Sequence, residues 1–480
     1  MRRKLTRRDM ITGSAAAACV LVAPRRARAQ SVTLNDASEL NPTPVARHWI
    51  VKGTPKTDFI ARLRAELKAA AAEGRPVAVS TARHSMGGQS LARDGVAVSL
   101  MDGTCEPNSQ SRSYRATAGT RWRDVIATLD PLGFSPAVTQ SNNDFGVSGT
   151  FSVNAHGWPV PYGPFGSTVR SIELMTADGA VVTCSRSENS ELFRLALGGY
   201  GLLGVVLSAE IEMVDNVLLA PSYDIIPSAD FAPRFIDATA DPAARMMYGR
   251  LSVVREDFLD EALLTTYRPV DTSDPLPPPE FGSAAKSLAR RVYRAQIGSD
   301  RGKRMRWWVE TVLRPHASSN RATRNALLNT PVALLASNDS ARVDILHEYF
   351  VPAERFGDFV ALCREVIQVS RQELLNITLR YVAADDLSVL AYAPGPRIAG
   401  VMAFSQRKTP EDEREMRRLT QRLIDGVAAL GGSFYLPYRL HARRDQVERI
   451  YANAGAFAAA KRKLDRKLIF RNALWDAYFA

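Results

Sequence analysis

The spacing of apolar residues predicts helices and strands in the first half of the chain. Between residues 57 and 72 they recur every three or four positions, which predicts a helix that stops near Gly74. Further helices are expected at 122–129 and 191–197, and short apolar runs predict strands at 76–80, 96–100, 114–118, 169–176, 181–184 and 204–213. Asp178-Gly179 lies between two of these strands and predicts a hairpin. Short elements of both kinds without regular βαβ alternation favour an α+β fold.

The pattern changes after about Asp215. Several prolines between residues 275 and 279 mark a loop, after which strands are predicted at 346–351, 377–382 and 400–405 and helices at 355–369 and 411–430. This arrangement favours a mixed α/β cap domain in which helices cover an antiparallel sheet. A length of 480 residues exceeds one ordinary core, so two domains are expected.

Much of the net charge of +12 lies at the N-terminus, where the first 29 residues hold eight Lys or Arg and one Asp. Thr6-Arg7-Arg8-Asp9-Met10 precedes a weakly apolar run that ends near Ala23, and Ala27-Arg28-Ala29 follows it. This is the pattern of a twin-arginine signal peptide over residues 1–29, and it predicts a periplasmic or secreted protein. The alternative of a lipoprotein anchored through Cys19 lacks the usual leucine, because Ala16 stands there.

The rest of the chain is closer to neutral, shows no nucleic-acid-binding module, and is not expected to bind nucleic acid. After residue 29 only Cys105, Cys184 and Cys363 remain, at spacings that fit no zinc site. No metal site is therefore predicted. The cysteines are expected to be ordinary thiols, and one disulfide is the alternative.

Two loops rich in small residues carry the candidate binding chemistry. The first follows the strand at 76–80, and the second lies about sixty residues later. Glycine lets backbone N–H groups converge on an anion, so the pair predicts the cradle of a large phosphorylated cofactor. The predicted cofactor-binding residues are Ala82, Arg83, His84, Ser85, Met86, Gly87, Gly88 and Gln89 in the first loop, and Ser148, Gly149, Thr150, Ser152, Asn154, Ala155, His156 and Gly157 in the second.

A third glycine segment, Gly199 to Gly204, matches G-x-G-x-x-G. That dinucleotide-binding pattern requires a strand before it and a helix after it, whereas a helix precedes and a strand follows here. A Rossmann-type site is therefore excluded at this position. A plain tight turn is one remaining interpretation.

In this order, the two loops, the hairpin and the third glycine segment resemble the vanillyl-alcohol-oxidase-type flavoproteins with a PCMH-type FAD-binding domain, in the alditol and sugar-lactone oxidase-like branch. The resemblance implies a two-subdomain FAD-binding domain at 40–215, a substrate or cap domain at 216–440 and a C-terminal return to the FAD domain at 441–480. It implies FAD as cofactor and adds four cofactor-binding residues: Gly204, Val205, Val206 and Asn472. His84 would carry the flavin covalently, or alternatively only hydrogen-bond within its loop.

The same resemblance suggests Arg380, Tyr438 and His441 as catalytic residues. Arg380 matches an arginine that faces flavin and substrate, but Thr378 stands where an acid is expected, and Tyr438 stands where relatives have a lysine. Tyr438 could take part in deprotonation if Arg380, Arg439 or His441 lowered its pKa. The alternative for Tyr438 is a core aromatic residue with a satisfied hydroxyl.

The expected function is an exported FAD-dependent oxidoreductase that transfers a hydride from a CH–OH group of a sugar, lactone or related alcohol to flavin N5. Oxygen or a periplasmic electron carrier would reoxidise the cofactor. A flavin-binding protein without turnover is one alternative, because the acid and lysine are missing. A membrane-associated oxidase of a lipid-linked sugar is another. It is motivated by an insertion at about 274–330, where 286–314 holds nine basic residues, two acidic residues and two tryptophans. The other interpretation of this segment is a solvated and partly mobile insertion.

Overall fold

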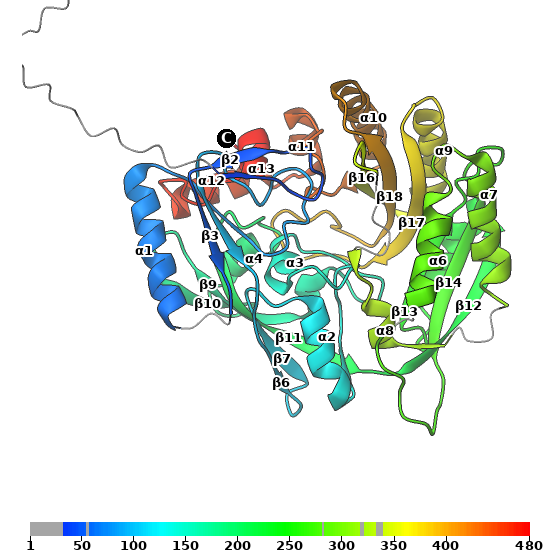
Figure 1. Cartoon of the computed structure of the whole chain (residues 1–480), viewed down its shortest axis with the longest axis horizontal. Helices are drawn as coiled ribbons and strands as arrows, with labels where there is room; N and C mark the ends of the chain where they lie inside the picture. The colour runs from blue at the N-terminus through cyan, green and yellow to red at the C-terminus, as the bar shows by residue number, and fades with distance from the viewer. Residues whose placement is uncertain (1–31, 54–56, 281–282, 317–320, 333–338) are drawn as a thin grey trace, which may run out of the picture.

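The structure, a computed structural model, describes residues 32–53, 57–280, 283–316, 321–332 and 339–480 (Figure 1). The predicted signal peptide at 1–29 lies outside these residues. Helices and antiparallel sheets occur together, as an α+β fold requires. Among the described helices, none is both long enough and apolar enough to cross a bilayer.

A small parallel sheet with strand order β3-β5-β4 opens the fold. Its strands pack against α1 through a core that includes Leu63, Leu67 and Val96. The elements of this region are β1 (Val32–Leu34), β2 (Thr43–Val45), β3 (Arg47–Val51), α1 (Thr57–Glu73), β4 (Val77–Ser80) and β5 (Val96–Leu100). The helix and the two strands predicted here are confirmed.

The second sheet has the order β10-β9-β11-β7-β6, and β8 also pairs with β11. β9 and β10 form the hairpin predicted from Asp178-Gly179. The elements here are β6 (Cys105–Asn108), β7 (Ser113–Thr117), α2 (Trp122–Leu129), β8 (Phe134–Pro136), α3 (Val147–Ser152), β9 (Val169–Met175), β10 (Val181–Ser185), α4 (Ser190–Ala196) and β11 (Val205–Asp215). α3 forms where only a loop was predicted, because its Gly, Ser and Thr residues give little apolar periodicity.

The third sheet is antiparallel, with strand order β15-β12-β14-β13-β17-β18-β16-β19, and lies on the right in Figure 1. Its strands are β12 (Leu218–Pro227), β13 (Met246–Leu251), β14 (Glu261–Pro269), β15 (Ala322–Thr323), β16 (Arg342–Val351), β17 (Glu373–Val382), β18 (Arg397–Arg407) and β19 (Ser433–Phe434). Its accompanying helices are α5 (Phe231–Thr239), α6 (Ser283–Arg294), α7 (Asp300–Trp308), α8 (Arg324–Leu328), α9 (Phe356–Ile367) and α10 (Pro410–Ala429).

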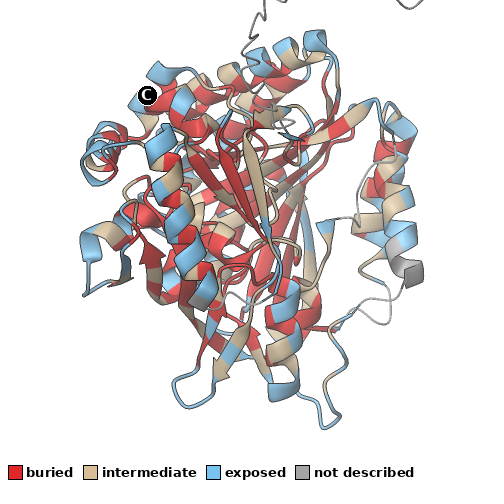
Figure 2. Ribbon diagram, turned by 60° about the vertical axis from the view of Figure 1, so that its left-hand side comes forward, coloured by how far each residue is buried: buried red, intermediate tan, exposed pale blue. Residues whose placement is uncertain are grey.

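The two faces of this sheet have different neighbours. Gly249 of β13 and Gly400 of β18 lie in one cross-strand row, and a Cβ at either would meet a phenylalanine of α5 or α9. On the same face His347 contacts Thr420 of α10. Residues one position along each strand therefore point to the opposite face, toward α6, α7 and the N-terminal sheets. Figure 2 shows the strands buried in red beneath helices with exposed blue sides.

The described part of the basic insertion is helical and only partly solvated, while the mobility predicted for this segment stays a prediction. Its described part forms α6 and α7, and α7 is fixed to the sheet by the buried side chains of Lys303 and Arg306. A β-bulge between Leu374 and Asn376 interrupts the regular strand pairing, and carbonyl groups at the bulge accept hydrogen bonds from these two cations. Lys303 Nζ donates to the Leu374 carbonyl at 2.6 Å, and Arg306 donates to that of Leu375. A count of charges in the sequence does not reveal which of them are buried.

The C-terminal segment contains α11 (Arg444–Ile450), α12 (Ala454–Leu464) and α13 (Ala473–Tyr478). Between the last two, Asp465 pairs with buried Lys461 and accepts the backbone N–H groups of Ile469 and Phe470, each at 2.9 Å. The Ile469 carbonyl then accepts the N–H of Val77 in β4. The chain thus returns to the strand that leads into the first predicted cofactor loop, while the predicted domain boundaries stay predictions.

Candidate functional site

The two predicted cofactor loops lie against each other. A Cβ at Gly146 or Gly149, at the start of α3, would lie 2.3 or 3.1 Å from Thr81 Oγ1, just before the first loop. The His84 ring packs on the Phe145 ring with centroids 4.5 Å apart. Glycine at these positions is therefore what lets the first turn of α3 approach the loop.

This contact places backbone donors together. Among the described residues, no group accepts a hydrogen bond from the backbone N–H of His84 or Ser85, or from Ser148 or Gly149 in the first turn of α3. Buried Arg83 Nη1 also has no hydrogen-bond partner among those residues. Converging N–H groups and an unpaired guanidinium nitrogen suit an anion such as a pyrophosphate. The arrangement fits a nucleotide cofactor without a metal.

Four residues of the second loop were predicted to contact the cofactor through short polar side chains, and this stays a prediction. All four side chains bond to other protein groups. Ser148 donates to the Ala118 carbonyl, Ser152 to the Ser148 carbonyl, Thr150 accepts from Trp122 Nε1, and Asn154 bonds to Asp385 and the Gly166 N–H.

The first loop is held to the segment that carries Tyr438. Gln89 Nε2 donates to the carbonyls of Leu436 and Tyr438, at 2.7 and 2.9 Å, and its Oε1 accepts the N–H of Gly87. A Cβ at Gly87 would lie 2.5 Å from the Tyr438 carbonyl oxygen. Met86 N–H donates to the Pro437 carbonyl. Gln89, Gly87 and Met86 therefore join the cofactor loop to the predicted catalytic segment.

Asn472 has a similar joining role. Its amide nitrogen donates to the carbonyls of Gln89 and Tyr200, at 2.8 and 3.0 Å, and its oxygen accepts from Trp475 N–H to cap α13. The side chain is fully used within the protein. Asn472 therefore positions the first loop, while the cofactor contact predicted for it stays a prediction.

The remaining predicted cofactor residues form part of the same region. Gly204 has φ +157°, a Cβ there would lie 2.6 Å from the Met175 carbonyl oxygen, and Val205 and Val206 begin β11 as buried residues. Ala155 is buried, and Gly157 packs against the Thr139 carbonyl. Gly88, at φ +72°, donates its N–H to Asp36, and Ala82 lies between β4 and His84.

A buried polar cluster lies beside these loops and forms the candidate catalytic centre. Glu348 of β16 is 4% exposed, its Oε1 is bonded to His156 Nε2, and its Oε2 accepts from the Tyr438 hydroxyl at 3.1 Å. Arg380 of β17 donates to Ser141 Oγ at 2.8 Å and leaves its Nε without a partner among the described residues. Burial lowers the pKa of Arg380, and the charge of nearby Glu348 opposes this only in part. Four distant parts of the chain thus bring a carboxylate, an imidazole, a phenol and a guanidinium together.

Sequence reasoning missed Glu348. Glu348 pairs with Val401 of β18, which pairs with Thr378 of β17, so Glu348 and Thr378 lie in one cross-strand row on the same face of the sheet. Arg380 lies two positions along from Thr378 and shares that face. An acid, Glu348, therefore lies two strands away from position 378, where the resemblance led us to expect one. An acid within the apolar run 346–351 was the available signal, because a buried charge needs a partner.

Tyr438 reaches the site but is not set up as a base. Burial raises its pKa, and the Glu348 carboxylate raises it further by charge and hydrogen bonding, while Arg380 opposes them only in part. The lowered pKa considered from the sequence is therefore wrong in direction. Tyr438 remains a protonated donor near neutral pH.

The structure removes His441 from the candidate centre. It is fully buried and bonded to Glu413 and Thr420 of α10, and its ring lies 6.3 Å from that of His347. His347 and Glu348 are neighbours in β16 and point to opposite faces of the sheet. His441 therefore lies on the α10 face, away from the Glu348 cluster, and its predicted catalytic role was wrong.

The close approach of α3 can be tested by adding one methyl group. Gly146→Ala should weaken FAD binding at least tenfold, because Gly146 has φ −88°, which alanine tolerates, yet its Cβ would press on Thr81. Flavin retention during dialysis measures the effect. The matched control is Gly455→Ala, where a Cβ meets nothing within 4 Å. Equal flavin retention in both variants would contradict the role given to this contact.

Comparison with known proteins identifies the cofactor. Residues 58–185 match the family described as FAD binding domain. The chain is 35% identical to cytokinin dehydrogenase 9 of Oryza sativa subsp. japonica over 135 residues, which is 27% of this chain and 26% of that protein. It is 34% identical to cytokinin dehydrogenase 1 of the same plant over 184 residues, 36% and 34% of the two chains. Cytokinin dehydrogenase 4 of Arabidopsis thaliana is 30% identical over 194 residues, 37% and 36%.

The chain therefore carries an FAD-binding domain, with FAD as its cofactor, and the matches support an FAD-dependent oxidoreductase. The matched stretches span about a quarter to a third of the length of these relatives. They do not single out the alditol and sugar-lactone branch. The substrate must be argued from the buried cluster.

Proposed function

We propose that this protein is an FAD-dependent oxidoreductase that removes a hydride from a carbon bearing a hydroxyl group, in a sugar, lactone or related alcohol. The buried Glu348 cluster beside the FAD loops is the observation that supports this proposal. Oxidation of an alcohol requires loss of the hydroxyl proton, for which a carboxylate with fixed partners is suited. Oxygen or a periplasmic carrier would be the final electron acceptor.

Glu348 is the proton acceptor in this proposal. Tyr438 and Arg380 are the half-buried members of the cluster, and the Tyr438 hydroxyl takes the substrate proton as it passes its own proton to Glu348 Oε2. His156, bonded to Oε1, holds the carboxylate in place. Arg380 stabilises negative charge on the substrate oxygen, which requires that oxygen to lie near its partly unpaired guanidinium. FAD supplies the hydride acceptor, held by the backbone of the two loops.

Arg380 also favours an alcohol over an amine. Removing a hydride from a carbon attached to nitrogen leaves a cation, which a neighbouring guanidinium destabilises, whereas an alcohol passes through an oxyanion that it stabilises. Cytokinin is thus the less suitable substrate class, although the matched relatives are cytokinin dehydrogenases. The proposal places the chain in the alditol and sugar-lactone branch, with the two-subdomain FAD fold of that resemblance.

Anaerobic mixing of the purified holoprotein with a panel of alditols, aldoses, lactones and cytokinins tests the proposal. At least one alcohol should bleach the visible absorbance of the flavin. Bleaching by a cytokinin but by no alcohol would overturn the substrate class. A flavin that no compound reduces would indicate a binding protein without turnover.

The resemblance also supports a covalent bond from His84 to the flavin. His84 lies at the FAD loops, and burial lowers its pKa, partly opposed by Asp144, so that the neutral, nucleophilic imidazole predominates near neutral pH. Acid precipitation of wild-type protein should give a pellet whose flavin fluorescence survives a denaturing gel. His84→Ala should release the flavin into the supernatant. Free FAD from wild-type protein would contradict the bond and leave the FAD domain intact.

Export to the periplasm through the twin-arginine pathway remains part of the proposal. The pattern at Arg7-Arg8 and the Ala27-Arg28-Ala29 cleavage motif support it. This pathway carries folded proteins, which suits a protein that loads FAD before export. Replacing both arginines with lysine should retain the protein in the cytoplasm, as cell fractionation would show.

A further inference from the structure

In the insertion between β14 and β15, α7 turns two of its four basic side chains, Lys303 and Arg306, toward the sheet. Lys303 and Arg306 are 3% and 6% exposed, whereas Met305 and Trp308 are each 49% exposed. A helix packed on a core normally turns its apolar side inward. Here the buried cations bond to the strand carbonyls at the β17 bulge, and Lys303 also pairs with Glu373 at 2.7 Å. The apolar side of α7 therefore faces outward.

Exposed apolar side chains gather at this place, which we call the α7 patch. It comprises Met305 and Trp308 on α7, Val312 and Leu313 in the π-helical turn that follows (Val309–Leu313), and Leu288 on α6. Of the fourteen large hydrophobic side chains that are exposed in the described part of the chain, five lie here within 26 residues. Single exposed apolar residues are ordinary, but a group of this kind marks an interaction surface.

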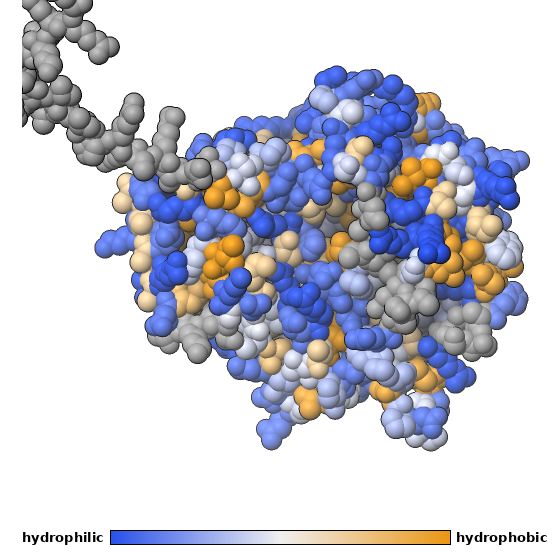
Figure 3. All heavy atoms as spheres, in the orientation of Figure 1, coloured by the Kyte–Doolittle hydropathy of each residue, from blue (hydrophilic) through white to orange (hydrophobic). Residues whose placement is uncertain are grey.

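Arginines accompany the apolar side chains. Arg301 and Arg304 lie four residues before Met305 and Trp308 and so share their side of the helix, and Arg291 is exposed on α6. Among the described residues, the acidic partner of Arg304 is Glu256, at a distance of 3.9 Å. Figure 3 shows orange residues next to blue ones on the right of the molecule, where Figure 1 places α7.

We propose that the α7 patch docks on the surface of an anionic phospholipid bilayer. A row of apolar side chains with a tryptophan, bordered by arginines, has the composition of a helix that lies in the lipid interface. Guanidinium groups bind lipid phosphates, while the indole ring lies at the level of the headgroups.

The candidate catalytic centre is connected to the α7 patch. The same helix is bonded through Lys303 and Arg306 to β17, and β17 carries Arg380 four residues beyond Asn376. Docking by the outer side of α7 would therefore hold the sheet of the cap at a fixed orientation to the bilayer. The proposal does not depend on which alcohol the site oxidises.

Flotation of the full-chain holoprotein with lipid vesicles tests the proposal. Binding is expected to vesicles containing about 30% phosphatidylglycerol and to fall at least tenfold on pure phosphatidylcholine or at high salt. The double variant Met305→Ser and Trp308→Ser should lose at least tenfold of the binding, and comparison within the full chain cancels any contribution from residues 1–29. The matched control, Val369→Ser, changes a side chain that is 72% exposed elsewhere.

A second measurement places the contact. Brominated phospholipids should quench part of the tryptophan fluorescence of the wild type, and Trp308→Phe should keep vesicle binding but lose that quenching. Three outcomes would each overturn the proposal. The serine double variant could float with vesicles as well as the wild type does, the Val369→Ser control could lose as much binding as that variant, or the wild type could fail to bind anionic vesicles. A dimer in sedimentation analysis that Trp308→Ser dissociates would also overturn it, because a second copy would then cover the patch.

Discussion

Replacing Glu348 with glutamine is expected to slow flavin reduction by the best alcohol about 10²–10⁴-fold, the usual contribution of a general base. Glutamine keeps the size and most of the hydrogen-bonding capacity of the side chain but cannot accept the proton. FAD content should not change, because the oxygen and nitrogen of the glutamine amide replace the two carboxylate oxygens and keep the bonds to Tyr438 and to His156 of the second FAD loop. Stopped-flow measurement of anaerobic reduction, with flavin content determined separately, isolates the chemical step.

Two further variants make this result specific. Glu354→Gln, at an exposed residue shortly after the end of β16, should leave the rate within about twofold, as surface changes usually do. Tyr438→Phe should give a smaller loss than Glu348→Gln, because it removes the bridging hydroxyl and leaves the acceptor. A Glu348→Gln enzyme with an unchanged reduction rate would refute the assigned base. A variant without flavin would show that Glu348 supports the fold of the site instead.

The elements of the fold were largely predictable because local spacing decides them. α1, α2, α9 and the hairpin of β9 and β10 follow directly from apolar periodicity or turn residues. The FAD-binding domain was predictable from the order of its glycine-rich segments, and it is confirmed by the family match over residues 58–185. The side-chain contacts of these segments were not predictable, because the Ser148 and Asn154 bonds depend on residues 30 and 231 positions away.

The catalytic cluster was less predictable because it depends on strand order. Arg380 was found through a motif, but Glu348 lies on a strand that becomes its neighbour only through β18. His441 failed for the converse reason. It follows Tyr438 by three residues, yet it turns to the α10 face, because Glu413 and Thr420 there satisfy its ring. Outside a regular strand, two residues that are close in sequence can lie on opposite faces of a sheet.

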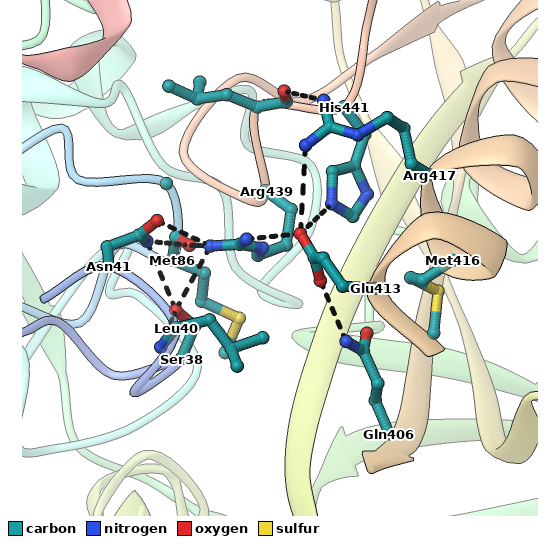
Figure 4. Close-up of polar contacts among 12 residues, drawn as sticks. Ser38, Leu40, Asn41, Met86, Gln406, Glu413, Met416, Arg417, Arg439 and His441 are labelled. Carbon is teal, nitrogen blue, oxygen red and sulfur yellow. Dashed lines mark hydrogen bonds and ion pairs between the residues drawn. The ribbon is translucent and has the colours of Figure 1, made fainter. Parts of the chain in front are cut away.

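The network around Glu413 joins the cap to the first FAD loop, as Figure 4 shows. Glu413 of α10 accepts from His441 at 2.8 Å and from Arg439. Arg439 also donates to Asn41 at 2.8 Å and to the Met86 carbonyl at 3.1 Å, and Met86 belongs to the FAD loop. The Arg439 side chain is 8% exposed, and Glu413 is the carboxylate that pairs with it.

Glu413→Gln is therefore expected to destabilise the protein by about 3 kcal/mol, because removing one member of a buried ion pair leaves the other charge unpaired. The thermal midpoint should fall, and flavin should dissociate faster because the Met86 loop loses its support. The control is Glu411→Gln on the same helix, whose partner Arg371 is 67% exposed, and which should change stability by less than about 1 kcal/mol. Equal midpoints for the two variants would contradict a structural role for the network.

The loss of stability caused by Glu413→Gln should also depend on pH in a defined direction. Burial alone would raise the pKa of Glu413, but the His441 hydrogen bond and the Arg439 charge outweigh burial and hold that pKa below its usual value of 4.5. A carboxyl with a lowered pKa in the folded state stabilises it fully above the unfolded pKa and loses that contribution as pH falls through the folded pKa. The midpoint difference between wild type and Glu413→Gln should thus be constant near neutral pH and shrink only below about pH 4.5. A difference that shrank between pH 8 and 6 would instead assign the effect to a histidine.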